Sequence, residues 1–426
     1  MPSARRAPDR GRVTLARHGV LRTRHPLVSV LAMLGVVVAV MGVSATGITA
    51  YNIWDAARTV AENSVLLPAD KELPPSLDAI EGGVNLLMVG TDSCEGENAA
   101  LSTACQSGDT DGERNDVTML VHISDEPRRV TVVSLPRDML EPIPSCPKED
   151  GSGNYSAMSS QKLNVSYSYG GLTCTVMTVE AITKQQIDFA AAIRWSGVIA
   201  MSDAIGGVDV CIGAGGISDP EHTGLTLSEG EHTLQGWEAL QFLRIRHGIG
   251  DGSDLGRISN QQQFMSSMVR KLQSDAVLAD PARLLTLATT AIGQMQKKEL
   301  VLSSGLANPT LMVQIAMAVK NVPFQDIVFV QYPTRYSSDY KQLYPVKEAA
   351  DQLFAALDAN EPLTLTGDSS QGSGVEVTGE VAQPGATPAP SASADAGTPA
   401  PEQRVELPST IAGQTADQTT CTVKGK

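Results

Sequence analysis

The run Asp254-Leu-Gly-Arg257-Ile-Ser-Asn-Gln261 holds the side chains of this sequence best suited to bind a charged ligand. At about 100° per residue, Asp254, Arg257 and Gln261 fall within about 60° of one another on a helix. The same stripe continues with Met265, Met268, Val269 and Leu272, so it would face a core. Buried charges are costly unless they are paired or meet a ligand. Two interpretations remain open: a ligand-binding set, or a solvent-exposed helix tip with Asp254 as N-cap and Arg257 paired locally.

Four other arginines stand close to predicted strands. Arg244 and Arg246 lie two residues apart, so in an extended chain both would point the same way. Arg137 follows one predicted strand and Arg114 precedes another. Because open α/β sheets bind ligands at strand ends, and guanidinium groups bind phosphate oxygens bidentately, this set suits a phosphate or pyrophosphate. For any single arginine the alternative is a surface ion pair that contributes little.

Two acids, Asp92 and Asp116, also stand at ends of predicted strands. Mg²⁺ takes one or two carboxylates together with the phosphates of a substrate. The pair therefore predicts a Mg²⁺ site beside the arginines, although each Asp taken singly also fits a turn or a cap.

The elements that must position these residues alternate between strands and helices over residues 81–360. Short β-branched or apolar runs predict strands at 85–90, 117–124, 129–135, 208–212 and 327–331, with a further apolar run at 189–193. Helical spacing covers 172–184, 196–205, 235–242 and 255–273, with further helices to about residue 320. This order predicts one α/β domain, with helices on both faces of a mixed sheet.

Composition agrees with a folded domain and narrows its partners. The chain has 426 residues, of which 42% are hydrophobic and 19% charged, so most of it can form a core. Its net charge is −15, from 32 Lys and Arg against 47 Asp and Glu. A nucleic-acid binder needs a basic face, so we expect no nucleic-acid partner.

The N-terminal part predicts a membrane anchor. Residues 1–25 hold seven arginines and one acid, and residues 26–50 hold no charge at all. An apolar helix of that length exceeds the hydrocarbon core of about 30 Å, and the basic side faces the cytoplasm. We therefore expect a single-pass anchor in the cell membrane, a cytoplasmic N-terminus and an extracellular domain after residue 50. A cleaved signal peptide is the alternative, but its apolar region is about 7–15 residues long.

The outer part divides into a stalk at 51–80, the domain at 81–360 and a disordered tail at 361–426, rich in Ala, Pro, Ser, Thr and Gly.

All six cysteines lie on the predicted outer side, where disulfides persist. Cys94–Cys105 is the first expected pair and Cys146–Cys174 the second, while Cys421 would tether the tail. No cysteine spacing suggests zinc.

Over residues 85–272 the chain resembles the LytR–CpsA–Psr cell-wall phosphotransferases of Gram-positive bacteria. The resemblance rests on seven motifs in order: Asn85-Leu-Leu-Met-Val-Gly-Thr-Asp-Ser93, Arg114-Asn-Asp116, Ser134-Leu-Pro-Arg-Asp138, Lys162-Leu-Asn164, Ala204-Ile-Gly-Gly-Val-Asp-Val210, Arg244-Ile-Arg-His247, and Asp254-Leu-Gly-Arg257 with Gln261-Gln-Gln-Phe264. It implies transfer of a glycopolymer from a polyprenyl-pyrophosphate carrier to a muramic acid hydroxyl of peptidoglycan, with release of polyprenyl phosphate. The isoprenoid would lie in an apolar tunnel between sheet and helices.

The resemblance also implies roles for individual residues. The pyrophosphate would be held by Arg114, Arg137, Arg244, Arg246, Arg257 and Gln261, and the acids near Mg²⁺ would be Asp92 and Asp116. Arg137, Arg244 and Arg246 would stabilise charge on the leaving lipid phosphate, with Asp254 orienting the arginines. The base that accepts the hydroxyl proton stays open between Asp138 and Asp254, because a carboxylate paired with arginine is a weak base.

Two positions depart from the family pattern: Cys94 opens a polar insertion where Arg often stands, and Asn260 also replaces a common Arg. The insertion would form a disulfide-held flap in place of an arginine contact.

Two alternative functions use the same site. One is a polyprenyl-pyrophosphate hydrolase, with water as acceptor, and the other is a non-catalytic membrane regulator or scaffold that binds lipid-linked polymer.

Overall fold

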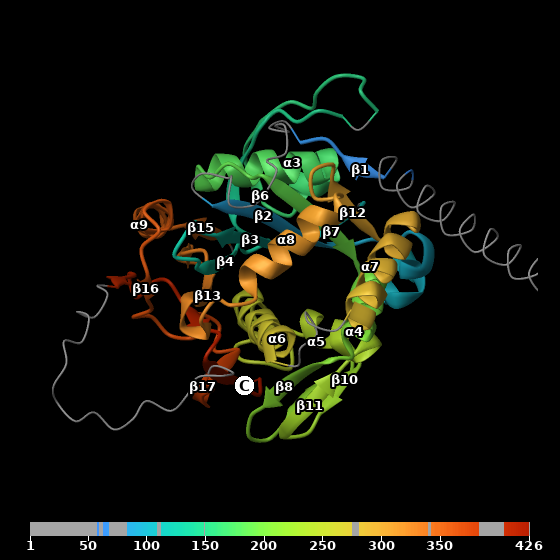
Figure 1. Ribbon diagram of the computed structural model, residues 1–426. Helices are drawn as coiled ribbons and strands as arrows, with labels where there is room; N and C mark the ends of the chain where they lie inside the picture. Colours follow the sequence, from blue (N-terminus) through green and yellow to red (C-terminus); the bar gives the residue numbers. More distant parts are fainter. Residues whose placement is uncertain are drawn as a thin grey trace, which may run out of the picture. The chain divides into compact units, whose positions relative to one another are not determined.

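An eight-stranded mixed sheet carries the strand ends predicted to bind the ligand (Figure 1). In spatial order its strands are β1 (Ser64–Val65), β12 (Leu300–Ser303), β7 (Phe189–Arg194), β2 (Val84–Asp92), β3 (Arg114–Ile123), β4 (Val130–Ser134), β13 (Ile327–Gln331) and β19 (Gly413–Thr415). β2, β3 and β4 are successively antiparallel, whereas β7 is parallel to β2 and β13 to β4. The expectation of a mixed α/β sheet is confirmed.

The computed structural model describes residues 58, 63–67, 83–108, 112–148, 150–274, 281–339, 342–382 and 404–425. The predicted basic segment 1–25 and membrane segment 26–50 lie outside these ranges, as does most of the predicted stalk. Among the described residues there is no helix with the length and apolar character needed to cross a membrane.

Helices cover both faces of the sheet (Figure 1). Their bounds are α3 (Val165–Thr183), α4 (Trp195–Ile205), α5 (Gly236–Arg244), α6 (Asp254–Ser274), α7 (Pro281–Gln296), α8 (Pro309–Val319) and α9 (Lys347–Asp358). One face forms a core with α3 and α9, in which Leu87 and Leu120 are fully buried. The other face packs against α4, α7 and α8. The alternation of side chains along the strands supplies both faces.

A second sheet lies beside α5 and α6. Its strands, in order, are β11 (Gly230–Leu234), β8 (Val208–Ile212), β20 (Gln418–Thr422) and β17 (Val375–Glu380). Phe242 of α5 and Phe264 of α6 pack in its core, with ring centroids 6.3 Å apart. The core joins the helix that ends at Arg244 to the helix that begins at Asp254.

Shorter elements complete the fold. They are the pairs β5 (Leu140–Ile143) with β6 (Met158–Lys162), β9 (Ile217–Asp219) with β10 (Leu225–Leu227), β14 (Thr334–Tyr336) with β15 (Leu343–Pro345) and β16 (Leu363–Thr364) with β18 (Val405–Glu406), together with α2 (Thr103–Ser107) and the 3₁₀ turns η2 (Gly96–Leu101) and η4 (Phe324–Asp326).

The expected disordered tail is wrong for residues 361–382 and 404–425, which contribute β16 to β20. β19 joins the central sheet beside β13, and β20 lies between β8 and β17. β-branched residues near the end of the segment, such as the Thr-Thr-Cys-Thr-Val run from Thr419 to Val423, favour strands. The small-residue composition of the whole stretch concealed that local signal. Residues 383–403, also part of the predicted tail, lie outside the described ranges.

Three disulfides pair the six cysteines. Cys94–Cys105 and Cys146–Cys174 are confirmed. The third, Cys211–Cys421, joins residues 210 positions apart and ties β20 to β8. Cys421 therefore anchors an ordered strand.

Most predicted elements are present, and the differences concern strands. β3 begins at Arg114, earlier than expected, because it continues its antiparallel pairing with β2. β12 interrupts the predicted helical region before residue 320, and Ser64–Val65 of the predicted stalk pairs with it as β1. The helix expected over 196–205 ends as predicted, since Gly206 adopts a left-handed φ of +80° that suits glycine.

Candidate phosphate-binding site

Asp254 and Arg257 meet at the start of α6. Their side chains are only 6% and 5% exposed, and Arg257 Nη2 lies 2.7 Å from Asp254 Oδ1. The same Nη2 donates to the backbone oxygen of Asp116, also at 2.7 Å. Of the two interpretations left open by the sequence, the local pairing is present, but it is buried against β3 and does not form a solvent-exposed tip.

Arg137 binds the same acids from the end of β4. Its Nη1 lies 2.6 Å from Asp116 Oδ1, and its Nε lies 3.3 Å from Asp254 Oδ1 and 3.5 Å from Asp138 Oδ2. Although burial alone lowers the pKa of Arg137, Asp116 and Asp254 raise it above its usual range. We call Asp116, Asp254, Arg137 and Arg257 the ion-paired frame.

Asp92 faces this frame from the end of β2. A register shift after Gly90 brings Asp92 opposite Arg114, whose backbone N–H donates to Asp92 Oδ1 at 2.7 Å. The Arg114 side chain is half-buried. Burial and the negative charge of Asp116 raise the pKa of Asp92 to about 7. Burial also acts to raise the pKa of Asp116, but Arg257 and Arg137 outweigh it and lower that pKa.

The Asp92–Asp116 pair fits a hard divalent cation. The negative charge of Asp116 is one cause of the raised pKa of Asp92, so the two carboxylates lie close enough to interact, and carboxylate oxygens suit Mg²⁺. Within the described ranges no group of three or more His, Cys, Asp or Glu side chains is arranged to hold a metal. Mg²⁺ does not need one, because substrate phosphates and water complete its coordination.

Arg244 and Arg246 differ from the frame arginines. Both are half-buried, and within the described part of the chain neither side chain has a carboxylate within ion-pair distance or a hydrogen-bond partner. Arg244 lies over the Trp195 ring, 4.0 Å from its centroid. Burial lowers the pKa of both guanidinium groups, and for Arg246 the charges of Arg137 and Arg257 lower it further. Asp116 acts against this lowering for both arginines, but only from a distance, because no carboxylate of the described residues forms an ion pair with them. Two partly desolvated cations of this kind favour the binding of an anion.

The backbone around these two arginines is not the extended chain that the sequence predicted. Arg244 is the last residue of α5, and Ile245 between the arginines is fully buried in the second core. Because the helix ends there, the last carbonyls of α5 need other donors. Gln261, predicted to bind the ligand, uses its Nε2 to donate to Leu243 O at 2.9 Å.

Two polar neighbours of the site were not predicted as site residues. Trp195, which supports Arg244, stands directly after β7. Its position at a strand end is the feature of the sequence that could have identified it as a site residue. Lys162 lies 2.7 Å from Asp138. Burial raises the pKa of Asp138, but Lys162 and Arg137 more than reverse this, so its pKa is lowered. Asp138 and Asp254, the two candidate bases, are both ion-paired.

The predicted flap over residues 94–108 packs against the start of α4. Asn98 is fully buried, donates to Glu299 Oε2 at 2.7 Å and accepts from the Ser196 N–H at 2.9 Å. Arg194 binds both oxygens of Glu113, at 2.9 and 2.6 Å, and lies 3.3 Å from Glu95. This insertion therefore supports the residues on either side of Trp195.

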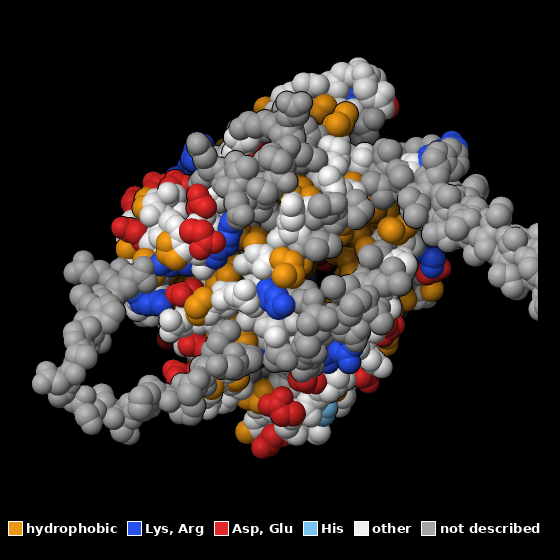
Figure 2. All heavy atoms as spheres, viewed as in Figure 1, with side chains coloured by type: hydrophobic (Ala, Val, Ile, Leu, Met, Phe, Trp, Pro, Cys, Tyr) orange, Lys and Arg blue, Asp and Glu red, His pale blue; other side chains and the backbone are white. Residues whose placement is uncertain are grey.

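The sheet face beneath α4, α7 and α8 is incompletely covered. Leu87 and Val89 are buried on the opposite face, whereas Leu86 and Met88 on this face are only partly buried. The same holds for Val117, Val121, Ala191, Ile193, Met265, Val269, Met312 and Ile315. Figure 2 shows hydrophobic side chains around a hollow in the middle of this face.

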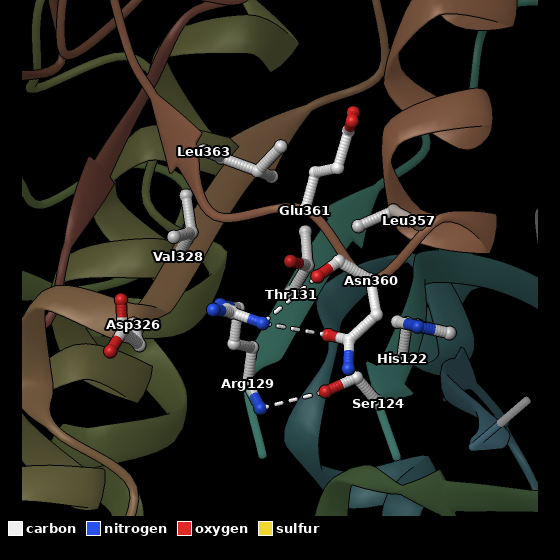
Figure 3. Close-up of a pocket in the computed structure, with 10 residues that line it drawn as sticks. All are labelled: His122, Ser124, Arg129, Thr131, Asp326, Val328, Leu357, Asn360, Glu361 and Leu363. Carbon is white, nitrogen blue, oxygen red and sulfur yellow. Dashed lines mark hydrogen bonds between the residues drawn. The ribbon is translucent and has the colours of Figure 1, made fainter. Parts of the chain in front are cut away.

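A second polar pocket lies at the opposite end of β3 and β4 (Figure 3). Arg129 donates to the backbone and side-chain oxygens of Asn360, at 2.9 and 3.0 Å, and its N–H donates to Ser124 Oγ at 2.8 Å. These contacts join the end of α9 to the sheet. We assign this pocket a structural role.

Comparison with known proteins agrees with the fold and the motifs. The LytR_cpsA_psr family model matches residues 51–357. A cell wall biosynthesis protein, LcpA of Corynebacterium glutamicum, is 27% identical over 292 residues, which are 64% of this chain and 54% of that protein. The polyisoprenyl-teichoic acid–peptidoglycan teichoic acid transferase TagU of Bacillus mycoides is 28% identical over 243 residues, which are 56% of this chain and 70% of TagU.

One solved structure, that of protein gbs0355 from Streptococcus agalactiae, shares the fold, with a TM-score of 0.51 and 18% identity over 68% of this chain and 91% of that one. The chain spans about half the length of the first curated relatives it matches. All seven motifs lie within the range that the family model covers, which is most of the sequence. The chain therefore belongs to the LytR_cpsA_psr family.

Proposed function

We propose that this protein transfers a glycopolymer from a polyprenyl-pyrophosphate carrier to peptidoglycan. The observation that carries the proposal is the pair Arg244 and Arg246, half-buried and without a carboxylate partner in the described residues, beside the ion-paired frame. A pyrophosphate supplies the missing negative charge, and guanidinium groups bind its oxygens bidentately.

In this reaction the acceptor hydroxyl gives its proton to a base, for which Asp138 and Asp254 are the candidates, and its oxygen attacks the phosphorus next to the sugar. A new P–O bond forms, and the bond to the bridging oxygen breaks. Polyprenyl phosphate leaves with the electron pair of that bond. Arg244 and Arg246 neutralise the charge that develops on the leaving phosphate, while the frame fixes Arg137 and Arg257 in place. Asp92 and Asp116 would hold Mg²⁺, which supplies further charge neutralisation when bound.

The incompletely covered sheet face supports the lipid part of the proposal. Partly buried Met88, Val117 and Ile193 belong to strands whose ends carry the charged site, so apolar surface continues from it. Burying an isoprenoid there removes both apolar surfaces from water. We further propose that residues 26–50 anchor the chain in the cell membrane with the N-terminus in the cytoplasm. The three disulfides are typical of an extracellular domain.

The test uses the full chain in detergent with Mg²⁺ and a short-chain polyprenyl-pyrophosphate disaccharide, with and without a peptidoglycan oligomer. Phosphodiester product and lipid phosphate are followed for wild type and Arg246→Ala. We expect an acceptor-dependent product that the variant loses. Lipid phosphate without product would instead identify a hydrolase, and tight lipid binding without turnover would identify a scaffold.

A further inference from the structure

Arg244 and Arg246 have no ion pair in the described residues to orient them. The Trp195 ring lies against Arg244, and the backbone that carries both arginines fixes where their side chains start. That backbone comprises the last turn of α5 and the loop after it, residues 242–250. Both sides of this segment contact the distant residues 421–425.

On the N-terminal side of Arg244 and Arg246, the contact with residues 421–425 passes through α6. Asn260 Nδ2 donates to Phe242 O at 2.8 Å, so it satisfies one of the carbonyls that the helix end leaves without a partner. Asn260 is fully buried. Its side chain thus connects α6 to the turn that ends at Arg244.

Thr422 of β20 fixes the orientation of Asn260. Thr422 Oγ1 lies 2.6 Å from Asn260 Oδ1 and 2.6 Å from Gln263 Oε1, and all three side chains are buried. The amide nitrogen of Gln263 already donates to Cys211 O and Thr420 O, at 2.8 and 2.6 Å. A hydroxyl carries one proton, so the Thr422 hydroxyl is the shared donor for two amide oxygens.

On the C-terminal side of Arg244 and Arg246, backbone hydrogen bonds join the loop to residues 423–425. Gly250 N–H donates to Val423 O at 3.0 Å, and Gly425 N–H donates to Gly248 O at 2.9 Å. Ile249 and Lys424 form an antiparallel bridge between these bonds. The loop that leaves Arg246 therefore runs as a short ladder along residues 423–425.

Residues 421–425 are themselves held firmly. The Cys211–Cys421 disulfide fixes the strand to β8, and the Gly213 N–H donates to Thr422 O at 2.9 Å. These residues lie beyond the range 51–357 that the family model covers. Their contacts are therefore a feature of this chain that the family match does not describe.

We propose that residues 421–425 position Arg244 and Arg246, with Thr422 and Asn260 as the positioning residues. The proposal rests on the proposed function only in assigning the two arginines to a pyrophosphate. Neither Thr422 nor Asn260 touches the ligand, because both act through the carbonyl of Phe242.

The experiment compares Thr422→Val with Thr420→Val in the full chain in detergent. Both threonines are buried on β20, but Thr420 Oγ1 has no hydrogen-bond partner in the described structure, so it is the matched control. Hydrogen exchange of amides 243–250 is measured without ligand, and calorimetry gives the Kd and stoichiometry for farnesyl pyrophosphate.

For Thr422→Val we expect faster exchange in this segment and a Kd weakened roughly tenfold or more at unchanged stoichiometry. Thr422→Ser restores both, and Thr420→Val stays within about twofold of wild type. A merely structural role would lower the stoichiometry and leave the Kd of the folded fraction unchanged.

Gly425→Ala perturbs the same loop from its other side, because a Cβ there would lie 3.0 Å from the carbonyl carbon of Gly248. It tests the proposal if Thr422→Val does not fold. Unchanged exchange in the variants that fold overturns the positioning role. Altered exchange in a protein whose wild type does not bind farnesyl pyrophosphate upholds the positioning role and instead counts against the proposed function.

Discussion

The arginines of the site fall into two groups with opposite energetics. Arg257 is buried and Arg137 partly buried, and both form ion pairs with Asp116 and Asp254. Arg244 and Arg246 are partly desolvated, and within the described residues no carboxylate forms an ion pair with them. A compensated buried charge stabilises the fold only while its partner remains. A buried charge without such a partner lowers the stability of the fold, and a bound anion would raise it again.

Substitution to Met at Arg246 and at Arg257 distinguishes the two groups. Arg246→Met should leave the free energy of unfolding unchanged or raise it, while lowering kcat/KM for the proposed transfer about 10²–10³-fold. Arg257→Met should lower the free energy of unfolding by about 3–5 kcal/mol, because it leaves Asp254 buried without its closest cation. Urea unfolding without ligand measures both. Equal destabilisation by the two variants would contradict this division.

The raised pKa of Asp92 predicts that the stability of the metal-free protein depends on pH. Its pKa is about 7 in the folded chain, above the ordinary value of 3.8, so between these pH values the folded state binds more protons than the unfolded state. The contribution of Asp92 is therefore present at low pH and is lost as pH rises through about 7. Asp92→Asn keeps the acceptor for the Arg114 N–H but removes this dependence.

The measurement is Tm from pH 4 to 8 in EDTA, for wild type and Asp92→Asn. We expect the variant to gain stability relative to wild type as pH rises through this window. A constant difference between the two proteins at every pH would show that Asp92 does not titrate there.

At the level of elements, the disulfide-held insertion after β2 serves as a support for the start of α4. Asn98 connects it to Glu299 and to the Ser196 N–H, next to the Trp195 ring that lies under Arg244. The insertion thus contributes to the site through α4.

Asn98→Leu should lower the free energy of unfolding by about 1–3 kcal/mol, since it leaves the Glu299 carboxylate and the Ser196 N–H without this partner. Glu97→Gln is the control on the same insertion. Its ion pair with Lys297 joins side chains that are 68% and 53% exposed, and such pairs contribute about 0–1 kcal/mol. Urea unfolding of both variants decides whether the buried contact matters more than the exposed one.

Local patterns in the sequence were sufficient to predict the helix at 255–273, the strands around 85–90 and 129–135, and the common helix face of Asp254 and Arg257. They placed the end of the helix at residue 242, two residues before Arg244, because two arginines within three residues fit a strand as well as a helix terminus. β19 and β20 were not predicted from the sequence, for a different reason. Each has only a few β-branched residues, and its pairing partner lies far away in sequence.

For the molecule as a whole, the Cys211–Cys421 link closes the longest of the three disulfide loops. It spans 210 residues, against 11 for Cys94–Cys105. In the chain-entropy account, stabilisation grows with the logarithm of loop length, because a longer loop restricts the unfolded chain more.

Replacing Cys211 and Cys421 together by Ser should therefore cost about 2–3 kcal/mol more unfolding free energy than replacing Cys94 and Cys105. Urea unfolding of the two double variants under identical conditions measures the difference. A smaller loss for the Cys211 and Cys421 variant would contradict the chain-entropy account for this disulfide.

The ladder between residues 423–425 and the loop after Arg246 also has a consequence for the time at which the site forms. A ribosome makes Arg244 and Arg246 well before Thr422 and its neighbours. Since contacts distant in sequence form late, the nascent chain passes through a stage in which the sheet can pair while both arginines remain unplaced. If the chain has the proposed function, affinity for pyrophosphate should emerge only after residue 425 has been synthesised, so a partly made chain would not bind the proposed lipid carrier.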